Sequence, residues 1–220
     1  MISRLRVNTG ILPPAQLRLW PKLAGAAQLG FVLYGGTAIA LRLGHRQSVD
    51  FDFFASAPLD REAIMSSIPD IAQCETLRDE RRTLSLRTPE GVYVSFFGDL
   101  TTGRVGDPEM TDAGIAVASL ADLLATKTKV ILQRAEAKDY RDIAALVRAG
   151  VSLPAALSAA RAMYGSAFNP RESLKAMVYF GDGDLESLPD SDKSALITAV
   201  GNVRSLPPVT IRSRQLCAQG

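Results

Sequence analysis

Two carboxylates stand one residue apart in a segment that otherwise has the composition of a buried strand. Residues 49–54 read VDFDFF, and the side chains of a strand alternate between its two faces. Asp50 and Asp52 are therefore expected on one face, with apolar residues on the other. Two like charges near apolar groups repel unless a cation is present. Because Mg²⁺ prefers hard oxygen ligands, we expect Asp50 and Asp52 to bind this ion.

A pair of glycines ends the hydrophobic run that precedes this strand. Residues 31–36 read FVLYGG, a short strand ending at Gly35 and Gly36, and the following TAIALRLG reads as a helix capped by Thr37. Glycines let a ligand approach the backbone, and the free N–H groups at a helix start favour an anion. A GG turn or a DxD pair alone is common, but their order and spacing together favour a phosphate and metal site.

The stretch GGTAIALRLGHRQSVDFDFF resembles the GG[ST]…DxD signature of the polymerase-β-like nucleotidyltransferase superfamily. It is more similar still to the AbiEii/AbiGii toxin branch, whose members read GGTALAL, a hydrophilic segment and then R-x-S-x-D-x-D-F. The resemblance implies a strand–helix–strand core that carries nucleotide-binding residues first and metal ligands second. In chain order these are Gly35, Gly36, Thr37 and Ser48, followed by the carboxylates Asp50 and Asp52.

A second motif of this branch, K-x6-R-x3-[KR]-D-x2-D, is matched by residues 127–142, KTKVILQRAEAKDYRD. Its charged positions are Lys127, Arg134, Lys138, Asp139 and Asp142. A spacing of seven places Lys127 and Arg134 on one helix face, where a cationic pair facing Asp50 and Asp52 would bind a triphosphate and stabilise its developing charge. Asp142 is expected to orient Lys127 or a nucleotide group, with Lys127 and Asp142 counted among the catalytic residues. The alternative is an ordinary charged helix face.

One position departs from the pattern. Many polymerase-β-like transferases place a third carboxylate, the general base, on a later strand. The candidate strand lies in residues 91–100, GVYVSFFGDL, where the alternating position is Ser95. This departure leaves open a degenerate transferase fold that binds a nucleotide or a partner without turnover. A plain interaction module with a structural Asp pair is a further alternative.

Composition argues against several other classes of protein. The chain has 220 residues and a formal net charge of +2, so bulk charge gives no argument for a nucleic acid or a membrane. One histidine argues against a His-rich metal site, and two distant cysteines fit a reducing compartment. We find no signal peptide and no apolar run of the ~20 residues that a membrane span needs. A cytoplasmic protein is expected.

These patterns predict an α+β nucleotidyltransferase fold with a mixed sheet and a helical C-terminal portion. We expect an α/β core over residues 1–117, a helical portion over 118–205 that closes the cleft, and a flexible tail over 206–220. Within the core, one helix is expected from Pro14 to Leu29, and a hairpin turn at residues 88–91.

The resemblance implies Mg²⁺-dependent transfer of a nucleotidyl group from an NTP to an RNA acceptor, with tRNA as one candidate, or to a protein. It also implies a toxin of a toxin–antitoxin or phage-defence pair, with a cognate antitoxin as partner.

Overall fold

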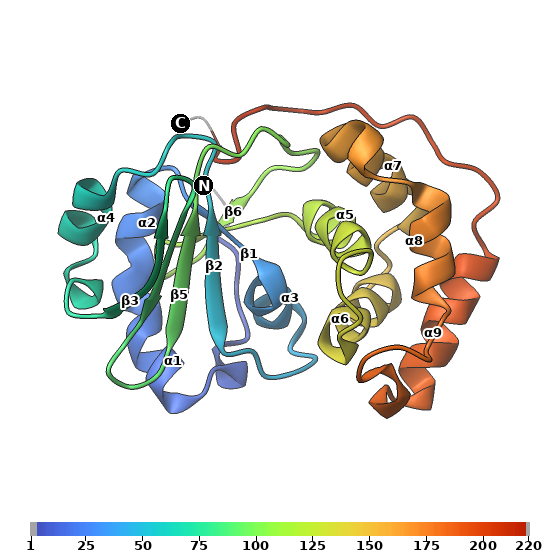
Figure 1. Cartoon of the computed structure of the whole chain (residues 1–220), viewed down its shortest axis with the longest axis horizontal. Coiled ribbons are helices and arrows are strands. Elements are labelled where there is room, and N and C mark those ends of the chain that lie inside the picture. Colours follow the sequence, from blue (N-terminus) through green and yellow to red (C-terminus); the bar gives the residue numbers. More distant parts are fainter. Residues whose placement is uncertain (1–3, 219–220) are drawn as a thin grey trace. The chain divides into compact units, whose positions relative to one another are not determined.

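The computed structural model describes residues 4–218 and divides into two units (Figure 1). The first unit contains the chain up to Ser119 together with the segment from Ser213 onward, and the second unit is Leu120–Arg212. None of the helices in residues 4–218 has the length and apolar character that a bilayer crossing requires.

The first unit is built on a mixed sheet. In the described part of the chain its strands have the order β3-β4-β5-β2-β1-β7-β6. They are β1 (Val32–Tyr34), β2 (Asp50–Phe54), β3 (Glu75–Glu80), β4 (Thr83–Arg87), β5 (Tyr93–Phe97), β6 (Glu109–Met110) and β7 (Ala116–Val117). β2 runs parallel to β5 and antiparallel to β1, and β1 is parallel to β7. The sheet with its helices confirms the predicted α+β class, and β4 and β5 form the predicted hairpin.

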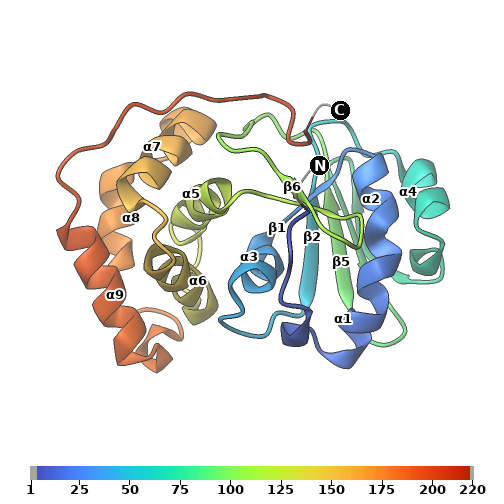
Figure 2. The ribbon, with the colours of Figure 1, turned by 180° about the vertical axis from the view of Figure 1, so that it is seen from behind.

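Helices lie on both faces of this sheet. α1 (Pro14–Leu19), α2 (Gly25–Gln28) and α4 (Arg61–Ser67) lie on one side of β2 and β5, and α3 (Gly35–Leu43) lies on the other (Figures 1 and 2). Phe51 and Phe53 are fully buried, and the Phe51 ring stacks on Trp20 with centroids 6.0 Å apart. The apolar side of β2 therefore packs under the α1 and α2 segment.

The single helix predicted from Pro14 to Leu29 is wrong. α1 ends at Leu19, a 3₁₀ segment occupies Trp20–Ala24, and α2 follows. Pro21 lies in that segment, and its missing N–H prevents a regular α-helical bond there. Gly25 then allows a close contact, since a Cβ on it would lie 2.0 Å from the Ser67 carbonyl oxygen.

The second unit is helical, as predicted for the C-terminal portion. Its helices are α5 (Leu120–Val130), α6 (Ala137–Arg148), α7 (Leu153–Tyr164), α8 (Pro170–Met177) and α9 (Asp190–Gly201). Ser152 and Asn169 accept hydrogen bonds from backbone N–H groups as the N-caps of α7 and α8, which fixes where these helices begin. Further 3₁₀ turns occur at Thr9–Ile11, Pro69–Ile71, Gly165–Ala167 and Leu185–Ser187.

A flexible tail was expected over 206–220, of which residues 219 and 220 lie outside the described part, and residues 213–217 make specific contacts in the first unit. Arg104, which is buried, donates to the carbonyl oxygens of Gln215 (3.0 Å) and Gly106 (3.1 Å) and pairs with Asp107. Leu216 is buried, and its N–H donates to the Ser56 hydroxyl at 3.0 Å. We call residues 213–217 with Arg104 and Ser56 the C-terminal clasp.

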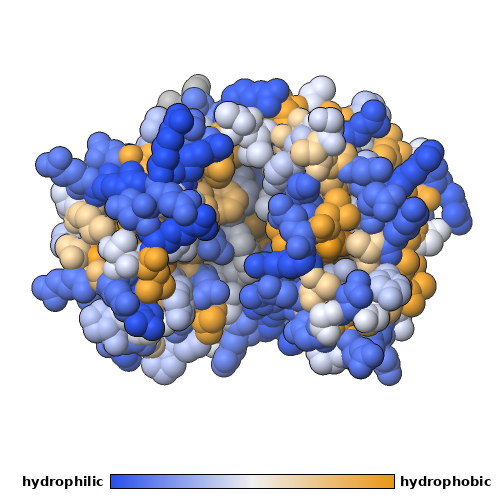
Figure 3. All heavy atoms as spheres, viewed as in Figure 1, coloured by the Kyte–Doolittle hydropathy of each residue, from blue (hydrophilic) through white to orange (hydrophobic). Residues whose placement is uncertain are grey.

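Surface character is mixed rather than segregated. Hydrophilic residues cover most of the face seen in Figure 3, and apolar residues form small patches between them. The large apolar side chains exposed among the described residues include Leu77 and Tyr93 in the first unit, and Tyr179 and Ile197 in the second. Isolated exposed apolar residues are ordinary on a soluble protein surface, but Tyr93 lies on the strand next to Asp50.

Candidate active site

The glycine turn and the second aspartate are packed against each other. Tyr34 pairs with Asp52 across β1 and β2, and α3 begins directly afterwards at Gly35. Gly35 has φ +72°, and a Cβ on it would lie 2.5 Å from Asp52 Oδ2. Only glycine meets both demands, because an L side chain would be strained at this φ and would collide with the carboxylate.

The first turn of α3 is tied to the start of β2 through hydroxyl groups. Thr37 Oγ1 lies 2.8 Å from Ser48 Oγ and also bonds the Asp50 carbonyl oxygen. A carbonyl only accepts, so Thr37 donates to Asp50 and accepts from Ser48. Thr37, predicted as the helix cap, instead lies inside the helix, which begins at Gly35. Its hydroxyl is buried and positions the strand that carries the aspartates.

Asp50 and Asp52 lie on one face of β2, as the alternation predicts. Both are half-buried, while Phe51 and Phe53 between and beside them are fully buried. Residues 4–218 contain no cluster of three or more His, Cys, Asp or Glu side chains able to hold a metal ion. Two carboxylates still fit Mg²⁺, which commonly takes one or two protein carboxylates and completes its shell with water and phosphate oxygens.

The position beside Asp52 on the neighbouring parallel strand is Ser95. The two residues are in register, and Ser95 pairs in turn with Ser85 on β4, with the hydroxyl oxygens 3.0 Å apart. Directly paired residues point to the same face of a sheet. A hydroxyl pair therefore occupies the place where a third carboxylate was sought.

The second predicted motif forms a charge cluster in the helical unit. Lys127 Nζ lies 2.6 Å from Asp139 Oδ1 and 2.7 Å from Asp142 Oδ2. Both carboxylates are fully buried, and only 7% of the Lys127 side chain is exposed. Arg134 Nε reaches Asp139 at 2.8 Å. We call these four residues the Lys127 cluster.

Arg134 does not share a helix with Lys127, so the predicted common helix face is wrong. α5 ends at Val130 and α6 begins at Ala137, which leaves Arg134 in the connection. The two cations nevertheless meet at Asp139, in the first turn of α6. About half of the Arg134 side chain is exposed, so of the two cations Arg134 presents more surface to solvent.

Asp139 pairs with both Lys127 and Arg134, and the sequence analysis gave it no role of its own. Burial would raise the pKa of Asp139, but the Arg134 hydrogen bond and the Lys127 charge outweigh it and hold that pKa below its ordinary value. Its only signal in the sequence was its place in the motif. The cluster belongs to the second unit and the aspartate pair to the first, so their predicted approach across a cleft stays a prediction.

Comparison with known proteins identifies the family of the chain. The family model described as "Nucleotidyl transferase AbiEii toxin, Type IV TA system" matches residues 23–105 and 92–201. These matches include the glycine turn, both aspartates and the whole Lys127 cluster.

Solved structures share the fold at low identity. MenT4, the nucleotidyltransferase toxin Rv2826c from Mycobacterium tuberculosis H37Rv, is 16% identical with a TM-score of 0.57, over 86% of this chain and 83% of its own. JHP933 from Helicobacter pylori is 18% identical with a TM-score of 0.54, over 86% and 90%. At these identities the likeness is one of fold.

A curated relative is closer in sequence over a shorter stretch. The uncharacterized protein aq_aa25 of Aquifex aeolicus (strain VF5) is 36% identical over 121 residues, which are 54% of this chain and 58% of the relative. The match thus spans a little over half of that protein's length. Because the family model covers most of the chain, between residues 23 and 201, the protein belongs to the AbiEii nucleotidyl transferase toxin family.

Proposed function

We propose that the protein transfers a nucleotidyl group from an NTP to the hydroxyl of an RNA or protein acceptor, with Mg²⁺ as cofactor. The acceptor oxygen forms a bond to the α-phosphorus, the bond to the leaving pyrophosphate breaks, and the hydroxyl proton passes to solvent. Family membership supports a transferase of the toxin class.

The observation that carries the proposal is the contact between Gly35 and Asp52. It brings the backbone of a helix start against a carboxylate, so that a phosphate held by the α3 N–H groups would lie beside a metal held by Asp50 and Asp52. When bound, Mg²⁺ would neutralise phosphate charge and lower the pKa of the attacking hydroxyl.

The other residues have supporting roles in this proposal. Gly36 leaves the helix start open to the triphosphate, and the Thr37–Ser48 hydroxyl pair fixes β2 relative to that helix. Arg134 would contact the nucleotide, because about half of its side chain remains exposed. Lys127 and Asp142 would act together, since the ammonium and the carboxylate are 2.7 Å apart.

Incubation with each labelled NTP, Mg²⁺ and total RNA or protein tests the proposal. Label should enter an acceptor with the wild type and be lost with Asp50→Ala. Asp112→Asn, which removes an exposed carboxylate outside the site, is the control and should retain transfer. Transfer that survives Asp50→Ala and Asp52→Ala together would refute the assignment.

The second candidate is a degenerate transferase that binds the nucleotide without turnover, and Ser95 favours it. Thermal unfolding with Mg²⁺ and NTP separates the two. Binding stabilises a protein by about 2.7 kcal/mol when free ligand is a hundred times its Kd. A rise in Tm that Asp50→Asn/Asp52→Asn abolishes, without transfer to any acceptor, would support the binder.

The toxin role and the antitoxin partner are part of the same proposal. Expression of the wild type should arrest growth, and Asp50→Ala should relieve the arrest if transfer causes it. Arrest that persists in the variant at equal protein level would contradict a catalytic toxin. A neighbouring gene whose product restores growth would identify the antitoxin.

A further inference from the structure

We propose that the open sheet face beside Asp50 binds the acceptor as a single-stranded nucleic acid, with Tyr93 stacking on a base and Arg87 contacting a phosphate. The inference rests on the proposed function, because it assigns the acceptor side of that site. Its evidence lies entirely within the first unit.

The strand register places these groups in one row. Asp50 pairs with Tyr93, Tyr93 with Arg87, and Arg87 with Glu75, across β2, β5, β4 and β3. Residues paired directly across strands share a face, and neighbouring strands are about 4.8 Å apart. The row therefore runs about 10 Å from Asp50 to Arg87, close to the rise of three stacked nucleotides at about 3.4 Å each.

The direction of the reaction points to the same face. The proposed triphosphate site at Gly35 lies on the β1 side of Asp52, since α3 begins where β1 ends. In phosphoryl transfer the attacking and leaving oxygens are roughly in line. The acceptor must then approach from the opposite side of the aspartates, which is the side of β5 and β4.

Tyr93 has the form of a stacking platform. It is 42% exposed, although it lies on a strand that is paired on both sides. A base stacked on an aromatic side chain contributes about 1–3 kcal/mol to single-strand binding, and every base offers a face for it. Ser95 and Ser85 beside it supply hydroxyls suited to the ribose and phosphate oxygens of such a strand.

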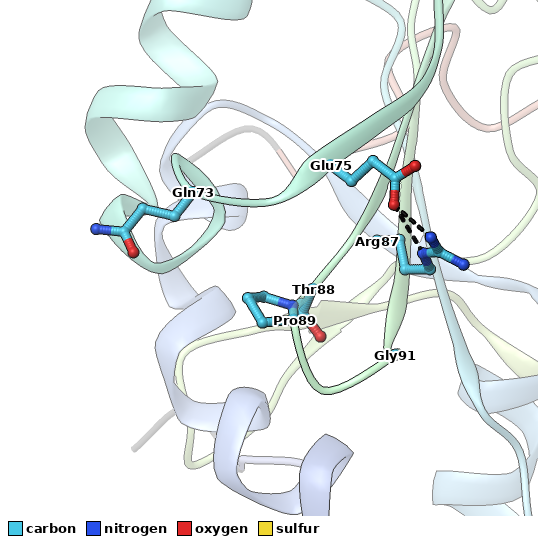
Figure 4. Close-up of a pocket in the computed structure, with 6 residues that line it drawn as sticks. All are labelled: Gln73, Glu75, Arg87, Thr88, Pro89 and Gly91. Atoms are coloured by element: carbon cyan, nitrogen blue, oxygen red, sulfur yellow. Dashed lines mark hydrogen bonds and ion pairs between the residues drawn. The ribbon is translucent and has the colours of Figure 1, made fainter.

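Arg87 supplies a cation that a phosphate of the nucleic acid can bind. Its guanidinium pairs with Glu75, and both side chains are about half exposed (Figure 4). The Arg87 guanidinium is protonated at every ordinary pH, and the neighbouring Glu75 carboxylate raises its pKa further. An exposed ion pair contributes only about 0–1 kcal/mol, so a phosphate can replace Glu75 at small cost.

The nucleic acid has space to continue beyond Arg87. A pocket of about 400 Å³ is lined by Arg87, Glu75, Gln73 and the turn residues Thr88, Pro89 and Gly91 (Figure 4). It adjoins the end of the row away from Asp50. A polar face with an exposed ring, a cation and hydroxyls suits nucleotides better than the apolar core of a protein interface.

Fluorescence anisotropy with a fluorescein-labelled single-stranded RNA tests the inference. The measurement is made in EDTA and without NTP, so that it reports on this face and not on metal binding or transfer. Tyr93→Ala should weaken binding by about 5- to 100-fold, and Tyr93→Phe should keep most of it. Arg87→Ala should lower the slope of log K against log salt by about one. Glu75→Gln, which frees Arg87, should tighten binding.

Two matched controls come from the same chain. Tyr179 is an exposed tyrosine of the second unit, and Lys175 of the same unit forms an exposed ion pair with Glu172. Tyr179→Ala and Lys175→Ala should leave RNA affinity unchanged. Equal affinity of Tyr93→Ala and the wild type, with circular dichroism showing both folded, would overturn the inference even if nucleotidyl transfer is found. RNA binding that follows the prediction without any transfer would refute the proposed function alone.

Discussion

At the scale of single residues, Gly35 joins the proposed phosphate side of the site to the proposed metal side, because it packs against Asp52. Gly35→Ala should cost about 1–3 kcal/mol for a side chain at positive φ, and it should also displace Asp52 and abolish transfer. Gly150→Ala is the control, because Gly150 has φ +84° and a Cβ added there would meet nothing within 4 Å. Chemical denaturation and label transfer measure the two effects. Full transfer in Gly35→Ala would show that the close contact is dispensable.

Ser95 allows a test by gain of function. Ser95→Asp would place a third carboxylate in register with Asp52. A general base contributes about 10²–10⁴-fold to a rate, so we expect faster transfer. Repulsion among three carboxylates should lower Tm in EDTA, and Mg²⁺ should restore it. Ser85→Asp, one strand further away, should give neither effect. A Ser95→Asp protein that is equally stable in EDTA and Mg²⁺ would argue against a metal at this face.

At the scale of elements, the Lys127 cluster joins α5 to α6. Lys127→Met would leave two buried carboxylates without their shared cation, and breaking a buried pair costs about 3–5 kcal/mol. The control is Lys138→Met, whose ion pair with Glu136 is exposed and should cost under about 1 kcal/mol. Equal stability of the two variants in urea would contradict a structural role for the cluster.

The same cluster predicts a dependence on pH. The pKa of Asp139 is lowered in the folded protein, so its contribution to stability is present above the unfolded pKa of about 3.9 and is lost as pH falls through the lower folded value. Asp139→Asn should therefore be less stable than the wild type at pH 7, with the difference shrinking below about pH 4. Urea unfolding at several pH values measures this, and a constant difference would contradict the lowered pKa.

At the scale of the whole molecule, the C-terminal clasp ties the end of the described chain to the first unit. Arg104→Ala removes the donor that holds the Gln215 carbonyl oxygen, so trypsin should cut faster after Arg214. Arg204, exposed in the segment after α9, is the internal control and should be cut at an unchanged rate. Equal rates at Arg214 in wild type and variant would show that the clasp does not protect the segment.

Sequence predicted the strand face of the candidate site better than it predicted the elements around it. Alternation placed Asp50 and Asp52 on one face because strand periodicity is local, and it also identified Ser95. Alternation could not predict the contact of Gly35 with Asp52, because that distance depends on the pairing of β1 with β2. Asp139 was missed as a hub, since the end of α5 before Arg134 depends on how α5 and α6 pack. The clasp was missed because its residues lack the periodicity of any helix or strand.

The clasp also sets an order of folding during synthesis. The first unit is interrupted by the second, so residues 213–217 are translated only after the roughly ninety residues of Leu120–Arg212. At about 5–20 residues per second, this delay lasts roughly 5–20 s. During that interval Ser56 lacks the Leu216 N–H and Arg104 lacks the Gln215 carbonyl oxygen, although Arg104 can already pair with Asp107.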